Sequence, residues 1–256
     1  MTGAARKPAI GVARWFAGVS LITAQAASRI VAAGRRGDLE RLDDTPREWG
    51  RRLCELIGIA VEVEHPDRLA APRPCVFVAN HASFADVWVL LAVIPGSVRF
   101  VAKKELLRIP VFGTALRAGG QIVIDRKNLR RAFGAYDEAA AAIRRGLSAV
   151  VFVEGTRSPD GTLQGFKKGP FVLAITAGVP IVPIYLEGTW GIMPRGRLVP
   201  RPARVRVLVG EPIATSGLAY EDRDALAART REAMLALRQG PSYRPPASVD
   251  ALGAGG

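Results

Sequence analysis

The sequence has few of the residues that build disulfide and metal frameworks. It contains 2 cysteines and 2 histidines among 256 residues, and these counts exclude a disulfide scaffold and a histidine-rich metal site. Cys54 and Cys75 both stand beside apolar residues, so we expect buried thiols in a reducing compartment. Hydrophobic residues make up 49% of the chain, which is enough for a full core and excludes intrinsic disorder as the main state.

The N-terminal region lacks a long uncharged run. The stretch between Arg14 and Arg29 has only 14 residues, whereas roughly 20 are needed to span a bilayer, so we expect no transmembrane helix. A cleaved signal peptide fits poorly, because Arg29 lies within the small-residue end and no clean cleavage site follows.

At helical spacing this N-terminal region is amphipathic. Arg14, Gln25, Ser28 and Arg29 fall in one sector of a helix. Apolar side chains centre on the opposite side: Val12, Trp15, Phe16, Val19, Ile22, Ala26 and Ile30. Such a helix either lies in a membrane interface, with Trp15 and Phe16 as anchors, or packs on its own domain.

Acidic residues are too few to balance the basic ones. The chain has 36 Lys and Arg against 23 Asp and Glu, a net charge of +13, and residues 99–131 alone carry nine basic residues against Glu105 and Asp125. This local excess indicates an anionic partner, either phosphate, a lipid headgroup or nucleic acid, unless it is only a solvated face. Nucleic-acid binding predicts stacking aromatics among the basic residues. The segment has only Phe100 and Phe112, both in apolar runs, so we expect no nucleic acid.

The rest of the chain alternates between strand and helix patterns. Short β-branched runs predict strands over 59–64, 75–79, 98–102, 121–125, 149–153, 181–186 and 205–209. Helical patterns lie between or after them, over 84–93, 111–118, 129–145, 168–178 and 219–238. This alternation predicts an α/β fold with a mostly parallel central sheet flanked by helices.

These patterns divide the chain into three parts. Residues 1–58 are expected to form an N-terminal amphipathic helical pair that docks on a membrane. Its second helix covers 45–58 and begins at Thr45-Pro46, after a turn over 34–44. Residues 59–240 form the α/β domain, and residues 241–256, rich in Pro, Ala and Gly, form a flexible tail.

One histidine directly follows a buried strand and has a carboxylate nearby. In Asn80-His81-Ala82-Ser83-Phe84-Ala85-Asp86, a regular helix would hold His81 and Asp86 about 140° apart. They can meet if His81 lies in the turn and Asp86 in the first helical turn. The carboxylate would then hold the imidazole in one tautomer and leave its other nitrogen to take a proton. The plain alternative is a hydrogen-bonded structural histidine.

Three further blocks follow other strands. Glu154-Gly155-Thr156-Arg157-Ser158 comes directly after a buried strand, where ligands collect in open α/β sheets. Arg157 offers a planar fork for phosphate, and Lys168 precedes a helix, although a polar surface turn has the same composition. The block 103–126 runs from Lys103 to Ile-Asp-Arg, and 179–184 is an apolar strand with two prolines, for which an edge strand is the plain alternative.

These four blocks, in this order, resemble the glycerolipid acyltransferase family, whose bacterial prototype is 1-acyl-sn-glycerol-3-phosphate acyltransferase. The family's Asn-His, four residues, Asp motif is matched at 80–86, and its Lys to Ile-Asp-Arg motif at 103–126. Its Phe-Pro-Glu-Gly-Thr-Arg-Ser motif is matched at 152–158, except that Val153 replaces Pro, and its Val-Pro-Ile-Val-Pro strand at 179–183. The resemblance covers roughly residues 60–215.

The resemblance implies roles for particular residues. His81 would be the general base that takes the proton of the acceptor hydroxyl, and Asp86 would orient it. The acceptor's glycerol phosphate would be bound by residues of the second and third motifs and a neighbour: Lys103, Arg126, Glu154, Gly155, Thr156, Arg157 and Lys168. Transfer would be direct, which agrees with the lack of a G-x-S-x-G nucleophile elbow. No metal and no bound cofactor is implied, since the thioester donor is a cosubstrate.

The implied reaction belongs to phospholipid synthesis. An acyl group would pass from acyl-CoA or acyl-carrier protein to 1-acyl-glycerol-3-phosphate (lysophosphatidic acid), giving phosphatidic acid. The enzyme would be peripheral, on the cytoplasmic face of the cell membrane, and held to anionic lipid by the N-terminal helix and the basic middle segment. The alternatives are an acyltransferase for another lysolipid, such as a lyso-ornithine lipid or lysophospholipid, or a non-catalytic binder of anionic membrane or nucleic acid.

Overall fold

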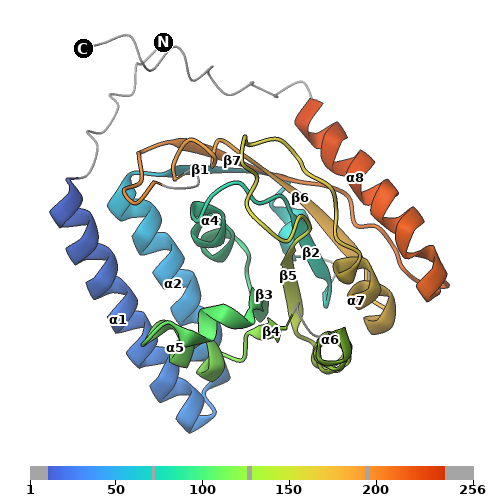
Figure 1. Ribbon diagram of the computed structural model, residues 1–256, viewed down its shortest axis with the longest axis horizontal. Helices are drawn as coiled ribbons and strands as arrows, with labels where there is room; N and C mark the ends of the chain where they lie inside the picture. Colours follow the sequence, from blue (N-terminus) through green and yellow to red (C-terminus); the bar gives the residue numbers. More distant parts are fainter. Residues whose placement is uncertain (1–10, 71–72, 126–128, 194–196, 240–256) are drawn as a thin grey trace.

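The core of the protein is a seven-stranded sheet with the strand order β1-β7-β6-β2-β5-β3-β4 (Figure 1). The computed structural model describes residues 11–70, 73–125, 129–193 and 197–239. The strands are β1 Ala60–Glu64, β2 Val76–Ala79, β3 Val98–Lys103, β4 Ile122–Ile124, β5 Ser148–Phe152, β6 Ile181–Glu187 and β7 Arg204–Val209. Neighbouring strands are parallel except for β6 and β7, which confirms the mostly parallel sheet.

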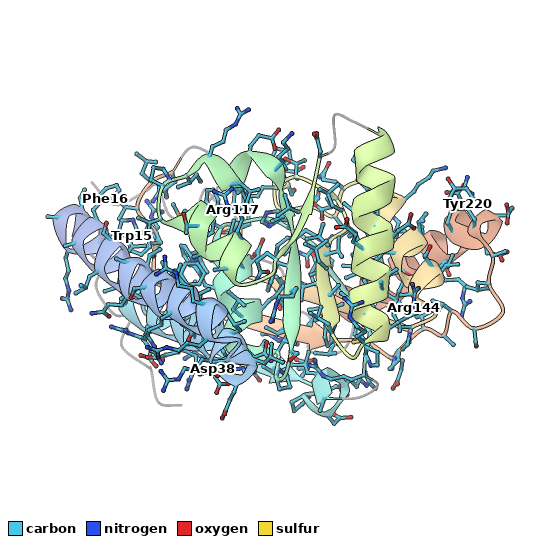
Figure 2. All side chains as sticks on the ribbon, turned by 90° about the horizontal axis from the view of Figure 1, so that it is seen from below. Trp15, Phe16, Asp38, Arg117, Arg144 and Tyr220 are labelled. Carbon is cyan, nitrogen blue, oxygen red and sulfur yellow. The ribbon has the colours of Figure 1, made fainter. Side chains whose placement is uncertain are left out.

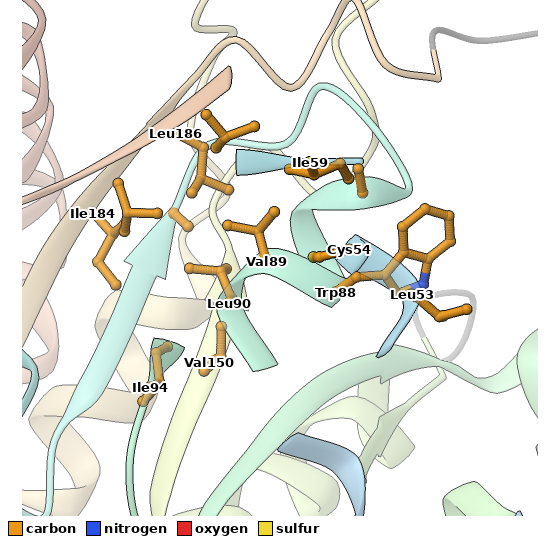
Figure 3. Packing of buried hydrophobic residues seen from close by; sticks show 14 of the residues in the cluster. Leu53, Cys54, Ile59, Trp88, Val89, Leu90, Ile94, Val150, Ile184 and Leu186 are labelled. Carbon is orange, nitrogen blue, oxygen red and sulfur yellow. The ribbon is translucent and has the colours of Figure 1, made fainter. Parts of the chain in front are cut away.

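Helices cover both faces of this sheet (Figure 1). They are α1 Val12–Arg36, α2 Leu39–Ile57, α3 Asp67–Ala70, α4 Ala85–Val93, η1 Lys104–Arg108, α5 Phe112–Ala118, α6 Leu129–Arg144, α7 Gly169–Ala177, η2 Tyr220–Asp222 and α8 Arg223–Gln239. Strand β2 is buried on both sides, so Phe77 and Ala79 join the core under α1, α2 and α4, whereas Val76 and Val78 join the core under α6, α7 and α8. Figure 3 shows the first of these cores, with Trp88 of α4 beside Leu53 of α2.

The second helix begins earlier than the sequence predicted. Gly37 ends α1 in the left-handed conformation, and Asp38 caps α2 by accepting a hydrogen bond from the backbone N–H of Arg41. The helix therefore starts at Leu39, and Pro46 lies inside it rather than in its first turn. The expected turn over 34–44 was wrong. Gly37 and Asp38 alone connect the two helices, because Gly37 ends the first helix and Asp38 caps the second.

The α1 helix packs on the domain through only part of its apolar side. Trp15, Ile22 and Ala26 are buried, whereas Val12 and Phe16 are 60% and 46% exposed. At 25 residues, α1 is long and apolar enough by length and composition to cross a membrane, although its uncharged run alone is not. Figure 2 shows Trp15 and Phe16 together at one end of α1, with Asp38 beyond its other end.

The proline-containing strand is central in the sheet. Strand β6 lies between β7 and β2 and is buried along its whole length, so the edge-strand interpretation was wrong. Pro183 is tolerated because the residues that pair with β7 begin at Ile184, one position further on.

Candidate active site

The polar blocks of the sequence meet at one edge of the sheet. Strands β2, β5 and β3 are parallel, so their carboxyl ends lie at the same edge. The register pairs Ala79 with Phe152, which brings the segment that starts at Asn80 beside the segment that starts at Val153. Lys103 ends the next strand over. The sheet topology thus unites three motifs that are far apart in the sequence.

His81 and Asp86 form a hydrogen-bonded pair. Nδ1 of His81 lies 2.7 Å from Oδ2 of Asp86, and the same oxygen accepts the backbone N–H groups of Ala82 at 2.7 Å and Ser83 at 2.8 Å. Asp86 is fully buried in the first turn of α4. These contacts fix the Asp86 carboxyl group in the first turn of the helix, where it is well placed to orient the imidazole of His81.

The imidazole of His81 is also held by an aromatic ring that stacks on it. Its ring stacks on Phe152 with a centroid distance of 4.0 Å and an interplanar angle of 13°. The backbone carbonyl of His81 accepts a hydrogen bond from the N–H of Ser158 at 2.7 Å. Only 17% of the side chain is exposed. With Nδ1 engaged by Asp86, Nε2 is the nitrogen left to exchange a proton with a bound hydroxyl.

Glu154 lies buried next to this pair. It is 2% exposed, and neither side-chain oxygen forms a hydrogen bond of normal geometry within the described residues. Burial raises the pKa of Glu154 to about 7, against a smaller lowering by the backbone N–H groups of His81 and Gln164 and by the Arg231 charge. A buried carboxyl of this kind is available to accept from, or donate to, a polar ligand group.

Arg157 lies in the turn that follows Glu154. Gly155 has a φ of 72°, a left-handed conformation that suits glycine, and the chain then presents Thr156 to solvent. The guanidinium of Arg157 lies 4.0 Å above the centre of the Phe84 ring. Because Phe84 stands between His81 and Asp86 in the sequence, this contact holds a cationic group next to the His81–Asp86 pair.

The other expected binding residues lie in different surroundings. Lys103 is exposed at the carboxyl end of β3, on the same sheet edge as His81. Lys168 precedes α7, and its Nζ forms an exposed ion pair with Asp224 of α8 at 3.0 Å. Arg126 lies outside the described residues. The structure therefore brings His81, Asp86, Glu154, Arg157 and Lys103 to one edge, and directs Lys168 toward α8.

Three positioning residues were not predicted as site residues from the sequence. Asn80 pairs with the backbone of Leu186, accepting its N–H at 2.7 Å and donating to its carbonyl at 3.0 Å, which fixes β2 to β6 beside His81. Phe152 and Phe84 supply the rings under His81 and Arg157. The available signal was their place within the matched motifs, since all three are motif residues without an assigned role.

The two serines of the motifs are committed to the local structure. Ser83 is fully buried, and its Oγ donates to the carbonyl of Met193 at 3.3 Å. Ser158 is 1% exposed, and its Oγ donates to Asp160 at 2.9 Å. Both hydroxyls are therefore engaged in contacts within the local structure.

The chain is similar to known acyltransferases over this region. A profile of the family described as Acyltransferase matches residues 60–187. The 1-acyl-sn-glycerol-3-phosphate acyltransferase alpha of Mus musculus is 36% identical over 202 residues, 78% of this chain and 69% of that one. The chloroplastic 1-acyl-sn-glycerol-3-phosphate acyltransferase BAT2 of Brassica napus is 40% identical over 145 residues.

The fold has a close match among solved structures. The crystal structure of the 1-acyl-sn-glycerophosphate (LPA) acyltransferase PlsC from Thermotoga maritima superposes with a TM-score of 0.77. It is 24% identical and covers 91% of this chain and 96% of that one. This match, together with the mixed sheet and the N-terminal helical pair α1 and α2 of this chain, confirms the predicted fold class.

The fold and the site define an α/β protein with a His–Asp pair at the carboxyl edge of a parallel sheet. With the profile match and the mouse relative, the chain belongs to the Acyltransferase family. The chain spans 42% of the length of the Brassica napus relative and 64% of the length of the human beta relative.

Proposed function

We propose that this protein transfers an acyl group from a thioester donor to the free hydroxyl of 1-acyl-glycerol-3-phosphate, forming phosphatidic acid. The single observation that carries the proposal is the buried Asp86 carboxylate bound to Nδ1 of His81 at 2.7 Å. This contact orients Nε2 as a general base for a hydroxyl. The names of the similar proteins support lysophosphatidic acid as the acceptor.

The mechanism needs one proton transfer and one addition. His81 Nε2 takes the proton of the acceptor hydroxyl, whose oxygen attacks the thioester carbonyl. The tetrahedral intermediate then expels the donor thiolate, which receives the proton from the imidazolium. Asp86 stabilises the imidazolium between the two steps. The donor, acyl-CoA or acyl-carrier protein, is a cosubstrate, and the proposal includes no bound cofactor or metal.

Arg157 is the proposed phosphate ligand. Its guanidinium has the planar shape that matches two phosphate oxygens, and its stacking on Phe84 holds it beside His81. Glu154, with Gly155 and Thr156 in the same turn, is the proposed contact for the glycerol hydroxyls. Lys103 adds positive charge from the end of β3; Arg126 and Lys168 are the more distant members of this proposed set.

The protein is proposed to act as a peripheral enzyme on anionic lipid at the cytoplasmic face of the membrane. Contacts hold α1 to α2 along its length: Thr23 accepts from Trp49 at 3.1 Å, and Arg29 pairs with Glu48 at 2.5 Å. These contacts favour a helix that lies on its own domain with Val12 and Phe16 exposed over one that crosses the bilayer.

The test is an acyl-transfer assay with purified protein. Several lysolipids are combined with palmitoyl-CoA or palmitoyl-acyl-carrier protein, and phosphatidic acid and free thiol are both measured. We expect thiol release that depends on lysophosphatidic acid and is lost in His81→Ala. Thiol release without an acceptor would identify a thioesterase instead, and preference for a lysolipid without a phosphomonoester would reject the proposed acceptor.

A further inference from the structure

The connection between η1 and α5 presents aliphatic side chains to solvent. Ile109 is 46% exposed and Val111 is 55% exposed, on either side of Pro110. We call residues 109–111 the apolar knuckle. Exposed large apolar side chains that stand together, rather than singly, mark a surface that contacts a partner or a membrane.

The backbone of the apolar knuckle is strained. Val111 has φ 64° and ψ −56°, and the N–H of Phe112 donates to the carbonyl of Pro110 at 2.6 Å, which makes a γ-turn centred on Val111. A β-branched residue rarely adopts this conformation. Such strain persists where the surroundings impose it, and it concentrates at functional positions.

The packing of η1 against α5 imposes the turn. A Cβ on Gly113 would lie 2.2 Å from the carbonyl oxygen of Leu107, so the two elements approach as closely as the backbone allows. The N–H of Gly113 also donates to the carbonyl of Ile109 at 2.8 Å. The knuckle is thus closed on the protein side, and its side chains extend outward.

Basic side chains flank the apolar knuckle. Arg108 and Arg117 are exposed on either side of it, and Lys104 keeps 47% of its side chain exposed although it pairs with Asp125 at 2.9 Å. Glu105 is the acidic residue of η1. Protruding aliphatic groups ringed by an excess of positive charge match the interface of an anionic bilayer, where apolar groups enter the acyl boundary and cations meet headgroup phosphates.

The apolar knuckle lies on the edge of the sheet that holds the site. It follows β3 through η1, and the carboxyl end of β3 is on the same edge as His81. Other exposed large apolar residues lie beside Arg157 and at the N-terminal end of α1. Phe84 stacks on Arg157, and Leu198 accepts a hydrogen bond from Trp15, next to Phe16. One exposed apolar side chain, Phe84, therefore lies next to the His81–Asp86 pair.

We propose that the apolar knuckle inserts into the interface of an anionic membrane, as a second contact beside the N-terminal end of α1. Two separated contacts fix the orientation of the protein on the bilayer, with the His81 edge facing the lipid. This inference rests on the proposed function, because a lipid acceptor is the reason for holding that edge at a membrane.

The test compares variants that separate strain from membrane contact. Glycine adopts a positive φ without strain, so Val111→Gly should keep or increase the denaturant midpoint. The same change, combined with Ile109→Ser, should lower the partition coefficient onto phosphatidylglycerol-containing vesicles about tenfold, since two exposed side chains no longer enter the interface. Leu39→Ser is the matched control, because Leu39 is 70% exposed at the start of α2, just after the C-terminal end of α1, and its partitioning should stay that of the wild type.

Each other outcome overturns the proposal. Equal partitioning of the double variant and the wild type would show that the apolar knuckle makes no membrane contact. Equal binding to phosphatidylcholine vesicles would reject the anionic surface. Unchanged vesicle binding with slower transfer from acyl-carrier protein would assign the surface to an acidic protein donor. Partitioning is measured without turnover, so failure of the proposed function appears separately, as absence of acylation by the wild-type protein.

Discussion

The guanidinium carbon of Arg157 lies 4.0 Å above the centre of the Phe84 ring. The contact joins two motifs separated by about 70 residues of sequence and places the proposed phosphate ligand next to His81. Phe84 lies within the segment that Asp86 organises. A change at Phe84 or Asp86 should therefore displace both His81, the proposed base, and Arg157, the proposed phosphate ligand.

Replacement of Phe84 by Leu is expected to weaken acceptor binding specifically. A partly exposed cation–π contact contributes about 1 kcal/mol, so the KM for lysophosphatidic acid should rise about fivefold while kcat stays nearly constant. Phe84→Trp keeps a ring under Arg157 and should retain the wild-type KM. A higher KM for the acyl donor instead of the acceptor would contradict the phosphate assignment.

Replacement of Asp86 by Asn removes the negative charge and keeps the shape of the side chain. An amide oxygen can still accept from Ala82, Ser83 and His81, but it cannot stabilise an imidazolium electrostatically. We expect kcat to fall by about 10²–10⁴ with little change in either KM. Because the pair acts as a unit, His81→Ala combined with Asp86→Asn should be no slower than His81→Ala alone. Additive losses would mean that Asp86 acts apart from His81.

Stability should depend on pH through Glu154. Burial raises the pKa of this carboxyl from 4.5 to about 7, so the folded state holds its proton more tightly than the unfolded state. The protein should therefore lose stability as the pH rises from about 4.5 to 7, by about 3 kcal/mol from this group. The Glu154→Gln variant has no titrating proton at this position. Its free energy of unfolding, measured in urea, should vary less with pH and should exceed that of the wild type at pH 8. Parallel curves for both proteins would show that Glu154 ionises normally.

Arg231 of α8 is expected to position the loop that follows Glu154. Its Nη1 donates to the carbonyl of Gln164 at 2.8 Å, and its charge lowers the pKa of Glu154. Arg231→Met should raise the acceptor KM and also shift the Glu154-dependent loss of stability to higher pH. Arg229→Met, an exposed change on the same helix, should do neither. If the pH dependence of stability in Arg231→Met were that of the wild type, Arg231 would have only a packing role.

A buried ion pair ties α2 to the sheet. Nη1 of Arg99, at the start of β3, lies 2.6 Å from Oδ1 of Asp43, and both side chains are largely buried. Asp43→Ala leaves the Arg99 charge unpaired and should lower the free energy of unfolding by about 3 kcal/mol, in one cooperative transition. Asp44→Ala removes a more exposed partner of Arg47 and should cost less than about 1 kcal/mol. Two separate transitions would show that the N-terminal helices unfold independently.

Local pattern was enough to define most of the elements and the chemistry. Short β-branched runs and helical periods predicted the strands and the longer helices after residue 58 to within a few residues, because strands buried on both faces read as apolar runs and amphipathic helices repeat every 3.6 residues. The short α3 and η1 were not predicted. The spacing of His81 and Asp86 already allowed the contact that the structure shows. The start of α2 was missed because the Asp38 cap outweighed the proline signal at Pro46.

The tertiary structure alone decided what depends on long-range placement. Strand order is not encoded locally, so the central position of β6, the stacking of His81 on Phe152 and of Arg157 on Phe84, and the pairing of Lys168 with Asp224 all required the fold. The same holds for the strain at Val111, which arises where η1 meets α5. The sequence by itself contains only 2 cysteines and 2 histidines. This excluded a disulfide or histidine-rich metal framework, and the motif around His81 indicated a site built on that residue. Which side chains surround that histidine was determined only when parallel strands brought their carboxyl ends to a common edge.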